Sequence, residues 1–143
     1  MSFVFFMKTA ILFSSLLFIT SCNNLSFYQK QQIEQLKNQG ITVDTPVGKF
    51  KKPASRGLAA GLNVLPGVGS FYLGVGEGAD SSHILYGVLN LLTWPLSIAW
   101  AVPEAFVDAD NINKQEMLSY YTYNKVGKKE LKQAGIKLDN DML

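Results

Sequence analysis

Residues 57–76, GLAAGLNVLPGVGSFYLGVG, and residues 84–102, ILYGVLNLLTWPLSIAWAV, are two uncharged apolar stretches that flank a polar turn at residues 77–83. Apolar runs of this length favour helices. A rise of about 1.5 Å per residue makes the second stretch roughly 28 Å long, close to the thickness of a hydrocarbon layer. The sequence therefore predicts an apolar helical hairpin over residues 57–107, whose first arm bends near Pro66.

Small and aromatic residues within the two arms are candidates for packing and membrane contact. Glycine weakens a helix in water, but it lets two backbones approach closely in lipid. Trp and Tyr rings have an apolar body and a polar edge, which suits the headgroup level of a membrane. The predicted membrane and packing residues are Gly57, Gly61, Gly67, Gly69, Phe71, Tyr72, Gly74, Gly78, Trp94 and Trp100. The alternative, that the Gly-rich tract is only a loop, stays open.

This region resembles a family of short domains that contain two transmembrane segments. Residues 66–74, PGVGSFYLG, carry the Gly-rich stretch and the Phe-Tyr-x-Gly signature of that family, and a Trp-containing second arm follows. The likeness covers residues 57–111 and departs from the family at Ser70, where many members have a basic residue or histidine. The resemblance implies membrane residence and a packing role more clearly than it implies any chemistry.

The charge distribution bears on how such a hairpin meets a membrane. Cytoplasmic loops usually carry an excess of Lys and Arg, yet the turn at 77–83 has neither, while Lys49, Lys51, Lys52 and Arg56 precede the first arm. We therefore expect the hairpin to lie in one leaflet, or to pack against copies of itself, rather than to cross. The basic run is either a juxtamembrane patch facing anionic lipid or an ordinary solvated linker.

The N-terminal part resembles the leader of a bacterial lipoprotein. An apolar run follows Lys8, and Ile19-Thr20-Ser21-Cys22 has the aliphatic, small, small, Cys pattern at which such leaders are cut and lipidated. The resemblance implies a signal peptide over residues 1–21, acyl groups on Cys22 and a location in the bacterial envelope. The outer membrane is favoured over the inner one, because Asn23 is not the Asp that retains many lipoproteins. The alternative is an uncleaved membrane helix followed by an incidental thiol.

The hairpin and its polar flanks make one mainly α domain. Residues 22–56 are interpreted as a polar tether with a short helix and the basic linker. Residues 108–143 are interpreted as a polar-aromatic C-terminal helical region.

The two flanks also share a local pattern. Residues 36–44 and 131–139 both begin with Leu-Lys and then place Gly and Ile at the same spacing, which predicts a helix, a glycine stop and a short strand. Residues 41–44 and 136–139 could pair as a small two-stranded sheet. Alternatively, the match could be a common local way to end a helix.

Candidates for catalysis or metal binding are few. His83 follows polar residues 80–82, but consecutive turn residues do not have the geometry of a catalytic triad. Residues 108–113, DADNIN, begin like a calcium loop, but Asn113 stands where that loop requires glycine, so a helix N-cap cluster is the better interpretation. An acylated Cys22 has no free thiol. We therefore predict a protein that is not an enzyme and has no cofactor or metal.

The sequence favours a lipid-anchored envelope protein with a membrane-associated hairpin and a structural or protein-interacting role. Its expected partners are membrane lipid and either further copies or an envelope protein. Nucleic acid is not expected, because the formal charge is only +2 and no basic surface is evident. Two alternatives are a small effector lipoprotein of the prophage exclusion type, which would bind an envelope channel or receptor, and a carrier of a hydrophobic ligand.

Overall fold

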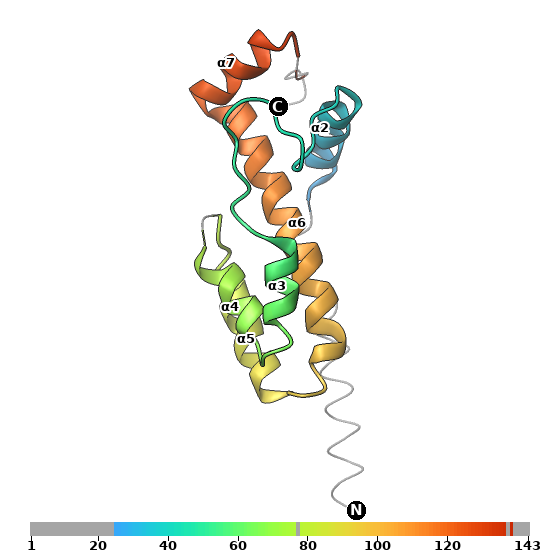
Figure 1. Ribbon diagram of the computed structural model, residues 1–143, viewed down its shortest axis with the longest axis vertical. Helices are drawn as coiled ribbons and strands as arrows, with labels where there is room; N and C mark the ends of the chain where they lie inside the picture. Colours follow the sequence, from blue (N-terminus) through green and yellow to red (C-terminus); the bar gives the residue numbers. More distant parts are fainter. Residues whose placement is uncertain (1–24, 77, 137, 139–143) are drawn as a thin grey trace, which may run out of the picture.

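A computed structural model describes residues 25–76, 78–136 and 138 of the chain. Within this part the chain forms six helices and no strand, so the predicted mainly α fold is confirmed. Figure 1 shows an elongated molecule along which α6 (Ile98–Tyr123) is the longest element. The predicted leader and Cys22 lie outside the described residues.

The hairpin half of the molecule, which we define as residues 57–107, is a bundle of short helical segments. Its members are α3 (Arg56–Leu62), α4 (Val68–Val75), α5 (Ser82–Leu92) and the first part of α6. They lie side by side in the lower part of Figure 1 and alternate in direction. As a result, the loops at residues 63–67 and 93–97 lie together at the lower end of the bundle.

Both arms of the predicted hairpin are interrupted. The first arm is divided between α3 and α4, consistent with the bend predicted near Pro66, and Gly67 between them has a φ of 73°. The second arm, residues 84–102, is divided between α5 and the start of α6, so it does not form one helix of bilayer length. The chain leaves α5 before Pro95, because proline has no N–H to donate and disfavours helical backbone in the residue before it. Among the described helices, none is both long and apolar enough to cross a membrane.

The polar run at residues 108–113 lies in the middle of α6, so its interpretation as an N-cap cluster is wrong. Asp108 and Asn113 are buried, and Asp110 forms ion pairs with neighbouring side chains. These side chains therefore bind groups other than the helix backbone and do not compete for its hydrogen bonds, so the helix continues through residues 108–113.

The flank half, residues 25–56 and 108–138, contains α2 (Phe27–Asn38), the second part of α6 and α7 (Lys125–Gln133). The short helix predicted in the N-terminal flank is α2. It begins with a capping box in which Gln29 donates its backbone N–H to Ser26 Oγ and Ser26 donates to Gln29 Oε1. The core of this half consists of large apolar side chains from both flanks: Leu36, Ile41, Val43, Phe50, Met117, Leu118, Tyr121 and Leu131.

The repeated pattern in the flanks forms the same helix terminator twice. The N–H of Ile41 donates to Leu36 O at 2.9 Å, and that of Ile136 to Leu131 O at 3.0 Å, with a left-handed glycine before each Ile. This is the Schellman arrangement, in which the two apolar residues also meet. The glycine stops are confirmed, but the strand at residues 41–44 is not formed. Thr42 and Thr45 bond each other there and fold the chain into a turn, while parts of residues 136–139 lie outside the described residues.

Asn113 attaches residues 39–55, the connecting segment between α2 and α3, to α6. Its Oδ1 accepts the N–H of Ala54 at 2.9 Å, and its Nδ2 donates to the carbonyl of the same residue at 2.8 Å. The side chain is fully buried, so water does not replace these bonds if they are lost.

Glycines allow α3, α4 and α5 to approach closely. A Cβ added at Gly69 would overlap the carbonyl oxygen of Ala59, and one at Gly87 would lie 2.6 Å from the ring of Phe71. In contrast, Gly57 and Gly61 face open space, so the predicted packing through these two residues is not formed between described parts of the chain.

We expect Gly69→Ala to lower the free energy of unfolding by about 1–3 kcal/mol, because the new methyl group has no room. We expect Gly61→Ala to raise it by about 0.5–1 kcal/mol, because alanine is the better helix former and the space is open. Chemical denaturation in a non-ionic detergent measures both. Equal effects of the two substitutions would contradict the packing described here.

Asn113→Ala should lower the free energy of unfolding by about 2–4 kcal/mol, because the buried N–H and C=O of Ala54 both lose their partner. The matched control is Asn111→Ala, at a half-buried position of the same helix. A thermal melt that shifts equally for both variants would show that the Asn113 bonds do not hold the connecting segment.

Candidate functional site

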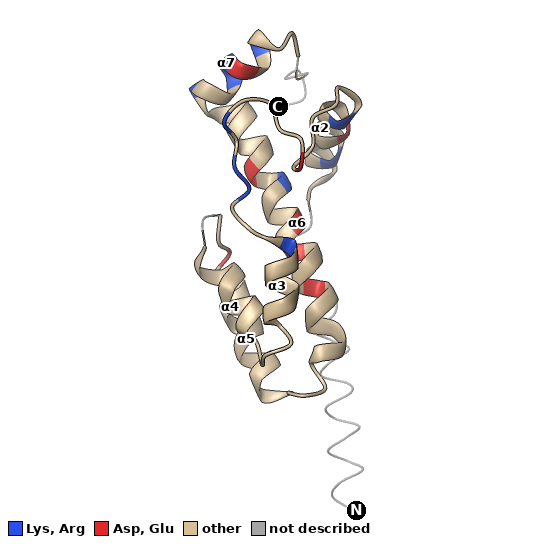
Figure 2. Ribbon diagram, in the orientation of Figure 1, with Lys and Arg blue, Asp and Glu red and all other residues tan. Residues whose placement is uncertain are grey.

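Charge is distributed very unevenly over the molecule. Figure 2 shows the Lys, Arg, Asp and Glu residues gathered in the upper part, with almost none on the lower ends of the bundle helices. Between Gly57 and Pro103, the one charged side chain among the described residues is Asp80. The hairpin half therefore has nearly no charge with which to interact with water or with a charged partner.

The apolar face of α5 points away from the bundle. Its side chains Ile84, Leu85, Val88, Leu91 and Leu92 recur at helical spacing and are all exposed, Leu92 to 75%. The residues that face inward are His83, Gly87 and Asn90, which are buried. A surface helix of a protein in water has the reverse arrangement, with the apolar stripe against the core.

The two loops at the lower end extend this exposed apolar surface. Val64 and Leu65 in the first loop are about half exposed, and Leu96 in the second is 73% exposed. Trp94, predicted as a membrane residue, lies in the second loop and is 52% exposed. Scattered apolar residues on a surface are ordinary, but many exposed apolar residues on one helix and the two adjacent loops indicate an interaction site.

The interior of the hairpin half contains a cluster of hydrogen-bonded polar side chains beside the buried Leu73 and several buried alanines. Asn63 Nδ2 donates to Ala101 O at 2.8 Å, and its Oδ1 accepts the N–H of Ser70 at 2.9 Å. Asn90 Nδ2 donates to Ser70 Oγ at 3.2 Å, and the Asn90 carbonyl accepts from Ser97 Oγ at 2.8 Å. These bonds join α3, α4 and α5 to the start of α6. Buried polar groups that are satisfied in this way need no water.

The other residues predicted for packing or membrane contact lie mostly inside the bundle. Trp100 is half-buried and donates Nε1–H to Asn90 Oδ1 at 3.2 Å, so it belongs to the polar interior rather than to the surface. Tyr72 accepts the N–H of Ser55 at 3.1 Å. A Cβ on Gly74 would meet Ile84, and one on Gly78 would meet Glu116, whereas one on Gly67 would overlap the backbone of Gly87. Sequence reasoning missed Gly87, although it is the one glycine in the second arm.

A group of ion pairs lies at the upper edge of the uncharged region, and we call it the ion-pair belt. Asp44 binds Lys52 at 2.8 Å and Arg56 at 2.7 Å, and Asp110 binds Arg56 at 3.2 Å and Lys114 at 2.7 Å. Two members of the basic run, Lys52 and Arg56, are thus paired within the chain. Neither predicted role of the run, as a lipid-facing patch or as a solvated linker, included such ion pairs.

His83 and Asp108 form a buried titratable pair between α5 and α6. Nδ1 of His83 lies 3.8 Å from Oδ2 of Asp108, and both side chains are buried. Burial raises the pKa of Asp108 to about 7, and the negative charges of Glu104 and Asp80 add to this effect. Burial also lowers the pKa of His83, against the opposing charge of Asp80. Asp108 was not foreseen as a partner, because pairing between distant residues leaves no local pattern.

The polar residues of the turn, Asp80 to His83, do not form a nucleophilic site. His83 points into the bundle, its Nε2 has no hydrogen-bond partner, and Ser81 and Ser82 are exposed. Asp80 instead accepts the N–H of Ser82 at 2.9 Å, and this bond holds the pKa of that carboxyl below its usual value. Among the described residues, no group of three or more His, Cys, Asp and Glu side chains is placed to hold a metal.

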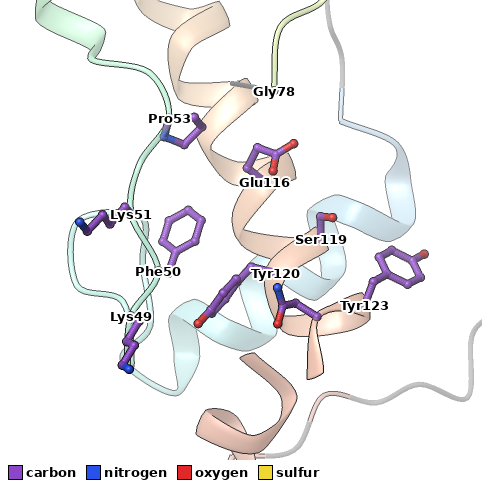
Figure 3. Close-up of a pocket in the computed structure, with 10 residues that line it drawn as sticks. Lys49, Phe50, Lys51, Pro53, Gly78, Glu116, Ser119, Tyr120 and Tyr123 are labelled. Carbon is purple, nitrogen blue, oxygen red and sulfur yellow. The ribbon is translucent and has the colours of Figure 1, made fainter. Parts of the chain in front are cut away.

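The cleft in Figure 3 lies between the connecting segment and the second part of α6 and has a volume of about 620 Å³. Phe50 and Tyr120 lie within it, but the amines of Lys49 and Lys51 and the ring of Tyr123 point away. Ligand sites usually gather several polar groups around one point. We therefore regard the exposed apolar surface, and not this cleft, as the candidate functional site.

The pH dependence of stability tests the buried pair. The pKa of Asp108 is above its ordinary value of 3.8 in the folded protein, so the folded state binds more protons than the unfolded state between pH 4 and about pH 7. Raising the pH through this range should therefore destabilise the protein through Asp108. Asp108→Asn should unfold at the same denaturant concentration as wild type near pH 4 and be more stable at pH 8, by up to on the order of 4 kcal/mol. A constant difference across this range would contradict the assignment.

No family model, curated protein or solved structure matches this chain.

Proposed function

We propose that this protein is a non-enzymatic, lipid-anchored protein of the bacterial envelope whose hairpin half inserts into one leaflet of a membrane. The acyl groups on Cys22 would hold the chain at the surface. The flank half would stay in water, with a structural or protein-interacting role.

The observation that carries the proposal is the inverted burial of α5. Five apolar side chains of this helix are exposed, while a histidine, a glycine and an asparagine face the bundle. At about 25 cal/mol per Å² of apolar surface removed from water, exposing such a face to water costs several kcal/mol that contact with lipid would recover. The hydrogen bonds that join Asn63, Ser70, Asn90 and Ser97 support the same conclusion, because polar groups inside a membrane need partners other than water.

The dimensions of the hairpin half support insertion into one leaflet. α5 has 11 residues, so a rise of about 1.5 Å per residue gives it a length of roughly 16 Å. One leaflet contributes about half of a hydrocarbon core that is roughly 30 Å thick. The belt of ion pairs around Arg56 begins at the level where such an inserted bundle would reach the headgroups.

The positions of the two ends of the bundle also favour insertion without crossing. The exposed apolar loops at 63–67 and 93–97 are at the lower end, whereas the turn with Asp80 and Ser82 is at the upper end. Gly78 in this turn lies beside Glu116 of the flank half. The turn that contains Asp80 is thus at the opposite end of the bundle from the exposed apolar loops.

Cysteine labelling of the full chain in intact spheroplasts tests this arrangement. With Cys22 acylated, Ser82→Cys should react with a membrane-impermeant maleimide before lysis, and Leu96→Cys should stay unreactive until detergent is added. Ser119→Cys, at an exposed position of the flank half, is the control for accessibility. Reaction of Ser82→Cys only after lysis would mean that the arms cross the membrane, and rapid reaction of Leu96→Cys would mean that the loop is in water.

Fluorescence quenching in vesicles tests whether the exposed apolar surface contacts lipid or another protein. Lipids brominated in the middle of their acyl chains should quench the exposed Trp94 strongly. Trp94→Phe leaves the half-buried Trp100, whose fluorescence should be quenched much less. Equal quenching of wild type and Trp94→Phe would refute lipid contact at the lower loop.

A further inference from the structure

α7 carries a stripe of lysines on its exposed face. Lys125, Lys128, Lys129 and Lys132 are spaced by three and four residues, so they lie on one side of the helix, and all four are exposed. The opposite side holds Gly127 and Leu131, which are buried against the end of α6 and in the flank core.

The acidic group that could neutralise this stripe is engaged elsewhere. Glu130 is the single acidic residue of α7, and it is turned inward. Its Oε2 accepts from Tyr120 OH at 2.9 Å, and both carboxylate oxygens accept the N–H of Lys49 at 3.2 Å. No ion pair of the four stripe lysines occurs within the described part of the chain. By contrast, Lys52, Arg56 and Lys114 near the ion-pair belt are all paired there.

The helix that carries the stripe is held at both of its ends, although the charges of the stripe act against helix formation. Lysines three or four residues apart repel one another, and Lys125 sits at the positive end of the helix dipole. Tertiary structure nevertheless holds α7 in place. Asn124 caps its start by accepting the N–H of Val126 at 2.8 Å, and the glycine terminator at Gly135 closes its end. A cationic row with fixed spacing therefore stands at the upper end of the molecule (Figure 2).

We infer that the lysine stripe of α7 is a binding surface for a linear polyanion, such as a chain of phosphate groups. Neighbouring lysines on a helix are about 5–6 Å apart, a spacing at which successive charges of an extended polyanion can be met in turn. A folded protein partner fits less well, because protein interfaces are depleted in lysine and need aromatic or apolar anchors. The one apolar side chain exposed on α7 is Val126.

The inference does not depend on the membrane proposal, although the two are compatible. α6 has 26 residues, so a rise of about 1.5 Å per residue separates its two ends by roughly 39 Å. The lower loops precede α6 and α7 follows it. A molecule inserted by its lower loops would therefore hold the stripe well above the headgroups of its own leaflet.

Binding of labelled long-chain polyphosphate to the full chain, in an uncharged detergent, tests the inference. Affinity should fall steeply with salt, and Lys128→Gln with Lys132→Gln should reduce the slope of log K against log salt by about 1.4, since each phosphate contact in a flexible polymer contributes about 0.7. The matched control, Lys30→Gln with Lys37→Gln, removes the same charge from exposed positions of α2 and should leave the slope unchanged.

Three results would overturn the inference. The first is no binding at low salt, and the second is an equal change of slope in the control pair, which would indicate attraction by total charge. The third is failure to bind polyphosphate while vesicles containing phosphatidylglycerol bind through the same two lysines, which would assign the stripe to a membrane surface. Circular dichroism spectra of both double variants must match wild type, because each substitution is on an exposed helix face.

Discussion

Close approach of α4 to its neighbours is the constraint on which the hairpin half depends. Where Gly69 meets the carbonyl of Ala59, and Phe71 lies against Gly87, the helices leave space between them for glycine, alanine, serine and asparagine. Leu73 and Ile112 are the large apolar side chains buried in this interior, whereas the leucines, isoleucine and valine of α5 named above are exposed on its outer side. Close approach of helices through small residues is also the packing found between helices in lipid.

The two halves are built on different physical principles, and α6 belongs to both. In the flank half, Leu36, Ile41 and Leu131 fill a core in the manner of a protein in water. In the hairpin half, α6 contributes Ala101 and Ala105 to a narrow interface. The ion pairs around Arg56 and the buried Asp108 fall where α6 passes from one half to the other. A single helix thus connects a region that suits an apolar solvent with one that suits water.

The sequence foretold those features that depend on local chemistry. Glycine at the left-handed position predicted both helix ends correctly at Gly40 and Gly135, because the signal lies within six residues. The break before Pro95 also has a local cause, since proline disfavours a helix at and just before its position, but the uniformly apolar run over 84–102 gives no sign of the residue at which α5 ends. The interpretation of residues 108–113 as an N-cap cluster was wrong. Asp and Asn suit a helix start, but they also suit a helix interior when distant groups such as Ala54 bind them.

Some features of the candidate site could likewise be predicted from local sequence, and others could not. An apolar hairpin could be predicted from composition, but which face of α5 is exposed could not, because inward and outward stripes have the same period. The pair of His83 with Asp108 and the inward turn of Glu130 depend on tertiary contacts between α5, α6 and α7, which no local pattern encodes.

The repeated helix terminators bear on the order in which this chain folds. Leu36 with Ile41 and Leu131 with Ile136 are brought together from the two ends of the sequence, with the whole hairpin between them. Contacts of such large sequence separation form slowly, whereas those among α3, α4 and α5 join neighbouring segments. The hairpin is therefore the region that can assemble first, while the chain is still being made. The flank core can close only after α7 is available, so the flank half is the part of the molecule that is completed last.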